Sequence, residues 1–238
     1  MQKNRIWEID AFRGILILGM VAVHFIYDLQ NFLLLPILAE SKLYALAAKW
    51  GGVLFFLLSG ISVTLGSRPV RRGLWVLGFG MAVSAVTAGL YLFGFAQESI
   101  LIYFGVLHCL GVCMILWPLF HKLPVGRLAL TAAGIIIAGF CLLRLRFPTG
   151  LWLIALGCTP SGFQSADFFP LLPFLGFFLL GAVFGQTLYK NKKTLFPAIA
   201  GENFLIRFLC QAGRDSLWIY ILHQPALLGA IYVWEAIL

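Results

Sequence analysis

Apolar runs of about twenty residues recur along the whole chain, and they constrain its fold more than any other feature. A helical run of this length spans the roughly 30 Å hydrocarbon core of a bilayer. Hydrophobic residues make up 61% of the 238 residues and charged residues 11%, which leaves more apolar surface than a soluble domain can bury. The alternation of polar and apolar residues that a membrane β-barrel needs is absent from the sequence. The sequence therefore predicts an all-α, polytopic transmembrane helical bundle that forms a single domain over residues 1–238.

About seven spans are expected. They cover residues 13–35, 45–66, 74–95, 100–120, 127–145, 170–189 and 214–238. Residues 147–169 are rich in Gly and Pro, and we expect a surface helix, a re-entrant segment or a lid there. With seven spans, 13 of the 17 Lys and Arg residues lie on one side of the membrane. The positive-inside rule then places the N-terminus in the cytoplasm and the C-terminus outside.

The net charge of +8 does not indicate a nucleic-acid partner, because the basic residues lie between the apolar runs, where membrane topology requires them. The five cysteines show neither a CxxC motif nor a Cys/His ligand spacing. We therefore expect no structural zinc, no other metal site and no disulfide framework.

The first apolar run carries Arg13 near its start and His24 eleven residues later. At about 1.5 Å per residue, His24 lies roughly 16 Å below Arg13, and about three turns bring it back to the same face. An ionisable side chain in a membrane helix costs about 2.5–3.5 kcal/mol on insertion scales, so its presence points to a function. The spacing predicts a charged ligand held by Arg13 at the membrane surface and proton chemistry at His24.

Two further histidines, His108 and His223, fall near the middle of their expected spans. One histidine in a membrane helix is usually a neutral side chain that bonds to a neighbouring helix. Three at similar depth favour a shared polar cavity, and all three are candidate catalytic residues. Pro225 interrupts the last run just after His223, and a broken helix frees backbone groups that need protein, water or a ligand.

An acidic residue accompanies the histidine of the first run. Asp28 lies four residues after His24, hence on the same helical face. It either orients the imidazole, which a general base requires, or simply reaches the outer interface. The sequence leaves both interpretations open.

The cytoplasmic side offers candidate ligands for phosphate. Asp10 and Arg13 are spaced i, i+3 and form either a surface ion pair or part of a binding mouth. A basic cluster after the second span either sets topology or binds phosphate together with Arg13, because guanidinium forks suit phosphate oxygens. The cluster consists of Arg68, Arg71 and Arg72.

Several motifs are shared with a known superfamily. They are WEIDAFRG with ten residues between Arg13 and His24, FFLLSG at 55–60, and GRDSLWIYILHQP at 213–225. In these motifs the chain resembles the membrane acyltransferase-3 superfamily. It is most similar to the bacterial relatives of heparan-α-glucosaminide N-acetyltransferase, through DAFRG at 10–14, IYFGVLH at 102–108 and DFFPLLPFLG at 167–176.

The resemblance implies an enzyme of a bacterial inner membrane. It implies that acetyl-CoA or another acyl-CoA enters from the cytoplasm and that the acyl group passes to a hydroxyl or amine of a sugar-like or other envelope acceptor. Residue by residue, His24 takes the catalytic role, Arg13 faces CoA, and His223 lines the site. The chain departs from its relatives in being shorter than typical acyltransferase-3 members and in lacking a histidine at 31–42.

Together these observations predict that His24 deprotonates the acceptor, with His108 or His223 polarising the thioester or positioning the acceptor. Direct transfer and an acyl-histidine intermediate both remain open. The alternatives are a proton-linked transporter or flippase, which would move its substrate without consuming acyl-CoA, a haem-binding electron carrier, and a structural subunit. We expect membrane lipid to surround the protein. The sequence leaves open whether the protein forms a homodimer.

Overall fold

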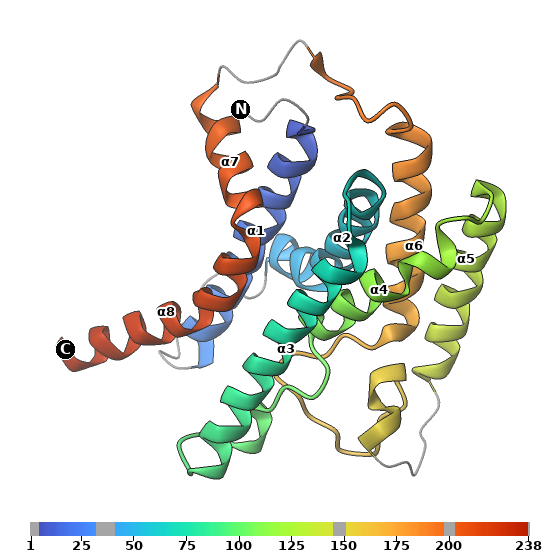
Figure 1. The fold of residues 1–238 in the computed structure, drawn as a ribbon. Coiled ribbons are helices and arrows are strands. Elements are labelled where there is room, and N and C mark those ends of the chain that lie inside the picture. Colours follow the sequence, from blue (N-terminus) through green and yellow to red (C-terminus); the bar gives the residue numbers. More distant parts are fainter. Residues whose placement is uncertain (1–4, 32–40, 145–150, 198–202, 238) are drawn as a thin grey trace. The chain divides into compact units, whose positions relative to one another are not determined.

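The computed structural model describes residues 5–31, 41–144, 151–197 and 203–237. Within these ranges it contains eight α-helices and two short 3₁₀-helices, and no strand beyond an isolated bridge between Phe104 and Phe168 (Figure 1). The elements are α1 (Trp7–Asn31), α2 (Lys42–Leu65), α3 (Pro69–Leu92), η1 (Glu98–Ile100), α4 (Val106–Phe120), α5 (Val125–Leu142), η2 (Leu151–Leu156), α6 (Leu171–Leu188), α7 (Phe204–Arg214) and α8 (Ser216–Ile237). The predicted all-helical class is confirmed.

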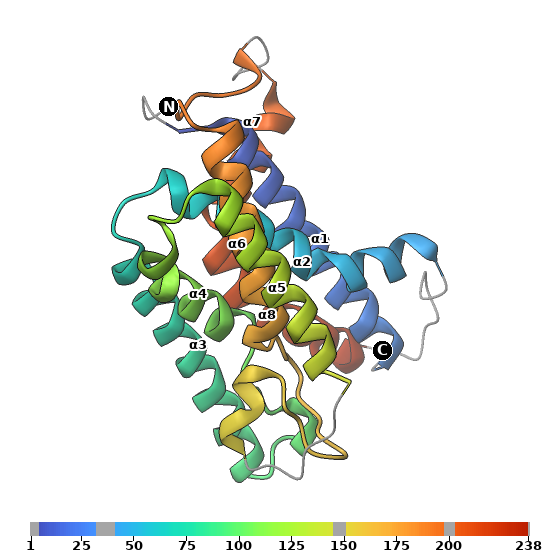
Figure 2. The same ribbon diagram turned by 90° about the vertical axis from the view of Figure 1, so that its right-hand side faces the viewer.

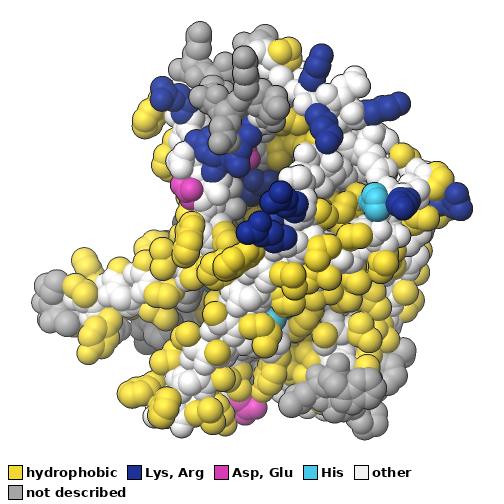
Figure 3. Space-filling model, viewed as in Figure 1, with side chains coloured by type: hydrophobic (Ala, Val, Ile, Leu, Met, Phe, Trp, Pro, Cys, Tyr) yellow, Lys and Arg dark blue, Asp and Glu magenta, His cyan; other side chains and the backbone are white. Residues whose placement is uncertain are grey.

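Six of the described helices are long and apolar enough to cross a membrane, namely α1, α2, α3, α5, α6 and α8. The chain is therefore an integral membrane protein. The seventh expected span, 100–120, corresponds to the shorter apolar helix α4, which begins only at Val106. The end of the first expected span, 32–35, and residues 147–150 lie outside the described residues. Many hydrophobic side chains lie on the face shown in Figure 3, and large apolar residues such as Trp75 and Leu130 are exposed, as a lipid-facing surface requires.

The chain divides into two compact units. A terminal unit consists of Met1–Phe55 and Asn191–Leu238, and a central unit consists of Phe56–Lys190. Helix α2 contributes its first part to the terminal unit and the remainder to the central unit.

In the terminal unit, the short helix α7 packs against α1, and α8 continues from it along α1 (Figure 1). The contact is close because glycines face backbone: a Cβ at Gly14 would overlap the carbonyl of Leu209, and one at Gly213 would overlap that of Asp10. Small residues let membrane helices approach in this way. The carboxylate of Glu8 fixes the segment before α7 by accepting bonds of 2.8 Å from the backbone N–H of Leu195 and 2.8 Å from the hydroxyl of Thr194.

In the central unit, α3 packs against α4 and α5 against α6 (Figure 2). The α3–α4 pair is antiparallel, because Gly73 meets Gly111 while Gly80 meets His108. The start of α3 and the end of α4 therefore lie at one end of this unit. The loops that join α3 to α4 and α5 to α6 meet at the other end, where the backbones of Phe104 and Phe168 pair.

Candidate active site

The two histidines of the terminal unit meet between α1 and α8. The ring centroids of His24 and His223 lie 4.9 Å apart, with the planes at 77°, an edge-to-face contact. The expected meeting of histidines from separate helices therefore occurs for this pair. His108 belongs to the central unit and is described with it below.

Each imidazole of the pair is oriented by its own helix. Nδ1 of His24 lies 2.9 Å from the carbonyl oxygen of Met20, and Nδ1 of His223 lies 2.6 Å from that of Tyr220. A carbonyl oxygen only accepts, so Nδ1 carries the proton in both rings and Nε2 presents a lone pair when the ring is neutral. Nε2 of His223 is buried and has no hydrogen-bond partner among the described residues. The pair therefore offers two imidazole nitrogens that can accept a proton.

Asp28 lies one turn after His24 and is only 1% exposed. Both of its carboxylate oxygens lie 3.1 Å from the amide nitrogen Nε2 of Gln224, which donates to them. The backbone carbonyl of Met20, rather than Asp28, accepts from Nδ1 of His24. These contacts do not test whether Asp28 orients His24, so that role stays a prediction. Asp28 itself is buried in the seam between α1 and α8.

Gln224 was not predicted from the sequence. Its amide nitrogen faces Asp28, while its carbonyl oxygen Oε1 is buried without a partner among the described residues. The seam between α1 and α8 thus combines a carboxylate with two unpaired acceptor atoms, Nε2 of His223 and Oε1 of Gln224. No feature of the sequence identified Gln224, because the burial of Asp28, which requires a donor, is seen only in the structure.

Two of the residues predicted to bind phosphate, Asp10 and Arg13, lie near the start of α1. Asp10 is buried and pairs with two guanidinium groups, Arg13 at 3.2 Å and Arg5 at 3.4 Å. Asp10 therefore positions Arg13, and the expected i, i+3 ion pair is present.

His108 has a different environment. It is 3% exposed, at the start of α4, where its Nδ1 accepts the backbone N–H of Gly105 at 3.2 Å. Its Nε2 must then carry the proton, and it lies 3.3 Å from the hydroxyl of Ser84, which in turn donates to the carbonyl of Ile102 at 2.5 Å. Both ring nitrogens thus have protein partners. His108 ties α3, α4 and the loop between them together.

Asp167 is the second side chain that fixes the start of α4. Its carboxylate accepts the backbone N–H of Val106 at 2.9 Å, which satisfies one of the unpaired donors of the helix. A Cβ at Gly105 would overlap this carboxylate.

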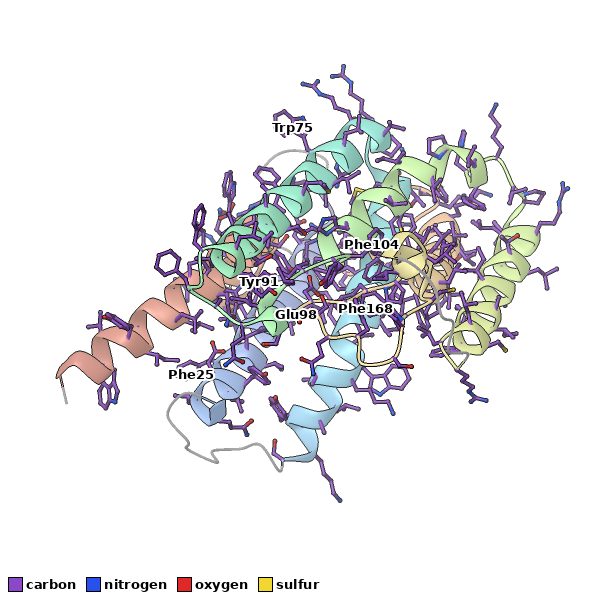
Figure 4. The ribbon with its side chains drawn as sticks, turned by 90° about the horizontal axis from the view of Figure 1, so that it is seen from below. Phe25, Trp75, Tyr91, Glu98, Phe104 and Phe168 are labelled. Carbon is purple, nitrogen blue, oxygen red and sulfur yellow. The ribbon has the colours of Figure 1, made fainter. Side chains whose placement is uncertain are left out.

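The basic cluster Arg68, Arg71 and Arg72 lies at the start of α3. Arg68 adopts a left-handed conformation, φ 56°, at the turn that reverses the chain from α2 into α3. Arg71 borders a shallow hollow of about 270 Å³ together with Trp75, which projects from the start of α3 (Figure 4). The cluster belongs to the central unit.

No group of three His, Cys, Asp or Glu side chains that could hold a metal ion occurs within the described ranges.

The fold and the seam define a polytopic membrane protein with a half-buried histidine pair beside a buried carboxylate. Residues 5–225 match the model of a protein family, heparan-alpha-glucosaminide N-acetyltransferase, catalytic, and the chain belongs to this family. No curated protein and no solved structure that was compared with the chain matches it. The predicted family is confirmed, and membership implies a membrane N-acetyltransferase that uses acetyl-CoA.

Proposed function

We propose that this chain transfers the acetyl group of acetyl-CoA to a primary amine of a sugar-like or other small envelope acceptor, in the seam between α1 and α8. The observation that carries the proposal is the pair of imidazoles, each with Nδ1 bonded to its own helix and Nε2 left as a base, beside the buried Asp28. A general base needs a ring in a fixed orientation, and the carbonyl oxygens of Met20 and Tyr220 supply this for the two imidazoles.

The composition of the seam favours an amine over a hydroxyl as the acceptor. Nε2 of His223 and Oε1 of Gln224 both require a donor, and a buried acceptor without one costs about 1–3 kcal/mol. An amine offers two or three N–H donors, whereas a hydroxyl offers one. An ammonium group is also attracted by the carboxylate of Asp28 before it loses a proton.

In the proposed reaction His24 is the base. The amine nitrogen attacks the carbonyl carbon of the thioester, and an N–H proton passes to Nε2 of His24. When the bond between carbon and sulfur breaks, the leaving CoA thiolate takes up this proton. The products are the acetylated amine and free CoA. His223 accepts a hydrogen bond from the amine and holds its lone pair toward the thioester.

The phosphates of CoA are assigned to the arginines. Arg13, held by Asp10, stands at the start of α1 on the helix that carries His24. Arg68, Arg71 and Arg72 are a separate candidate phosphate site within the central unit. Guanidinium binds phosphate oxygens in a bidentate manner. The rise of roughly 16 Å from Arg13 to His24 suits the long pantetheine arm of CoA.

We further propose seven crossings, with the N-terminus in the cytoplasm, the C-terminus outside and the protein in the inner membrane of a bacterium. In the central unit the end formed by the start of α3 and the end of α4 carries the arginine cluster and Lys122, whereas the opposite end carries Glu98 and Asp167 with one described arginine, Arg144. This asymmetry matches the positive-inside rule.

The test uses purified protein in lipid nanodiscs, radiolabelled acetyl-CoA, glucosamine as the amine and glucose as the hydroxyl probe. We expect glucosamine to be acetylated and glucose not. His24→Ala should lower kcat at least 100-fold, since general-base catalysis contributes about 10²–10⁴. The acetyl-CoA-induced rise in melting temperature should persist in His24→Ala and weaken in Arg13→Ala.

His121→Ala is the matched control, because this histidine lies exposed at the end of α4 and should not affect turnover. Near-normal turnover in His24→Ala would show that His24 is not the base. Movement of a substrate across the membrane without consumption of acetyl-CoA would instead support a transporter.

A further inference from the structure

One side of α3 is exposed along most of its length. The opposite side packs against α4, where a Cβ at Gly73 would lie only 2.7 Å from the carbonyl oxygen of Gly111. The exposed side carries apolar or small residues on successive turns, and Trp75 among them is 63% exposed. We call this side the α3 stripe, and it consists of Leu74, Trp75, Gly78, Met81, Ala82 and Val86. A stripe of this kind on a membrane helix is suited to contact with lipid chains.

The length of α3 fixes the depth of the stripe in the bilayer. Arg71 lies four residues before Trp75, hence on the same helical face. Tyr91 lies 20 residues after Arg71, near the other end of the helix (Figure 4). At about 1.5 Å per residue the two are roughly 30 Å apart, which is the thickness of the hydrocarbon core. Arg71 is therefore at the level of the lipid phosphates, and Trp75 is about 6 Å deeper, where the acyl chains begin.

A shallow hollow of about 270 Å³ marks this level of α3. Arg71, Leu74 and Trp75 line it. Arg71 is exposed, and its guanidinium makes no hydrogen bond or ion pair within the described part of the chain. The guanidinium of Arg72 instead lies over Gly66, where the chain turns out of α2. Arg71 is thus the charge that faces the hollow.

The lining of the hollow favours an amphiphile with a negative head. A guanidinium binds two phosphate oxygens at once, and no carboxylate lines the hollow to oppose this. Trp75 joins a large apolar surface to one N–H donor, which suits the region between headgroup and acyl chains. From Trp75 the stripe continues 11 residues to Val86, or about 16 Å, roughly the depth of one leaflet.

We propose that the hollow binds one anionic phospholipid, with the phosphate on Arg71, the glycerol region against Trp75 and an acyl chain along the α3 stripe. Arg68, Arg72 and Lys122 lie at the same end of the central unit and add to the attraction for a negative headgroup. A nucleotide such as CoA supplies phosphates but no acyl chain long enough to cover the stripe. The lipid site goes beyond the proposed function and does not depend on acetyl transfer.

Native mass spectrometry of the purified full chain in detergent tests the site. The protein is titrated with phosphatidylglycerol and, separately, with phosphatidylcholine of the same acyl chains. We expect the first phosphatidylglycerol to bind more tightly than phosphatidylcholine. Arg71→Gln should weaken phosphatidylglycerol binding about fivefold, as expected for the loss of one basic residue at an anionic lipid headgroup. Trp75→Ala should weaken the binding of both lipids, because its contact is with the part that they share.

The matched control lies on α5, which starts at the same end of the central unit. Arg127 and Leu130 are exposed and repeat the spacing of Arg71 and Leu74, but Thr131 stands where the stripe has Trp75. Arg127→Gln should therefore bind phosphatidylglycerol like the wild type. All three variants change exposed side chains and should melt like the wild type.

Two results would overturn the lipid site. One is phosphatidylglycerol binding that is equal in the wild type and Arg71→Gln, or that falls as much in Arg127→Gln, since the charge would then act without a site. The other is displacement of the bound phosphatidylglycerol by free CoA in stoichiometric amounts, which would assign Arg71 to the phosphates of CoA.

Discussion

Cys210 lies on the face of α7 that packs against α1, and its thiol donates to the backbone carbonyl of Trp7 at 3.4 Å. Burial, reinforced by the nearby negative charge of Asp10, raises the pKa of the Cys210 thiol above its ordinary value of 9.0. The thiolate is the reactive form, so the thiol should be poorly reactive near neutral pH.

We predict that a variant retaining Cys210 as its single cysteine reacts slowly with iodoacetamide at pH 8. The rate should still rise with pH above 9, because the thiolate fraction grows until the pH passes the raised pKa. Mass spectrometry of the alkylated protein measures the rate. Unfolding in detergent should remove the protection, and labelling that is equally fast in folded and unfolded protein would contradict the contact.

At the scale of elements, α7 is an amphipathic helix that packs against α1 through the face that carries its small residues. Its buried positions are Cys210, Ala212 and Gly213, whereas Phe204 and Phe208 are exposed. The exposed phenylalanines are suited to the apolar part of the membrane interface. The helix therefore joins the start of α1 to the start of α8, the two helices that form the seam.

We predict that Gly213→Ala destabilises the protein, because the added methyl group overlaps the backbone carbonyl of Asp10. Overpacking of this kind costs about 1–3 kcal/mol, and a fall in melting temperature in detergent would report it. Acetyl-CoA binding should weaken in parallel, since Asp10 also holds Arg13.

Gly19→Ala is the matched control, since a Cβ at this position of α1 meets nothing within 4 Å. It should melt like the wild type. A melting temperature of Gly213→Ala at or above that of Gly19→Ala would mean that α7 and α1 are not packed closely.

At the scale of the whole molecule, α4 decides the number of crossings. Its 15 residues extend about 22 Å, less than the roughly 30 Å of the hydrocarbon core. The preceding residues 101–105 are not helical but have their backbone groups tied to the neighbouring loop. Non-helical backbone at membrane depth is tolerated when it is buried in protein in this way.

We therefore predict that α4 crosses and that the two termini lie on opposite sides. A green fluorescent protein fused to the N-terminus should fluoresce, and alkaline phosphatase fused to the C-terminus should be active, as expected for cytoplasmic and external positions respectively. A C-terminal phosphatase that is inactive, with a fluorescent protein that is active at both ends, would mean six crossings.

Much of this architecture follows from the sequence, because apolar runs of membrane length admit few structures other than helices. The similar depth of His24, His108 and His223 in their runs predicted a shared cavity. The rings of His24 and His223 do meet, whereas His108 belongs to the central unit. Depth alone, however, does not distinguish them from His108, whose partners Ser84 and Gly105 depend on how two helices pack.

The partner of Asp28 shows why side-chain pairing is harder to predict. Spacing along one helix pointed to His24, four residues earlier, whereas the observed donor is Gln224, which lies 196 positions away in the chain. An imidazole in a helix can bond to the carbonyl of the preceding turn, so His24 does not need Asp28 for orientation. Long-range pairings of this kind leave no mark in local spacing.

The division of the terminal unit between the two ends of the chain has a consequence for biosynthesis. Asp28 enters the membrane with α1 at the beginning of translation, yet its donor Gln224 is added 196 residues later. At about 5–20 residues per second this is a wait of roughly 10–40 s. Throughout that interval the nascent chain holds a carboxylate whose final partner does not yet exist. A ribosome that stalls before α8 would release a protein with a complete central unit but without Gln224, the donor to Asp28 of α1. We expect membrane quality control to recognise such a protein.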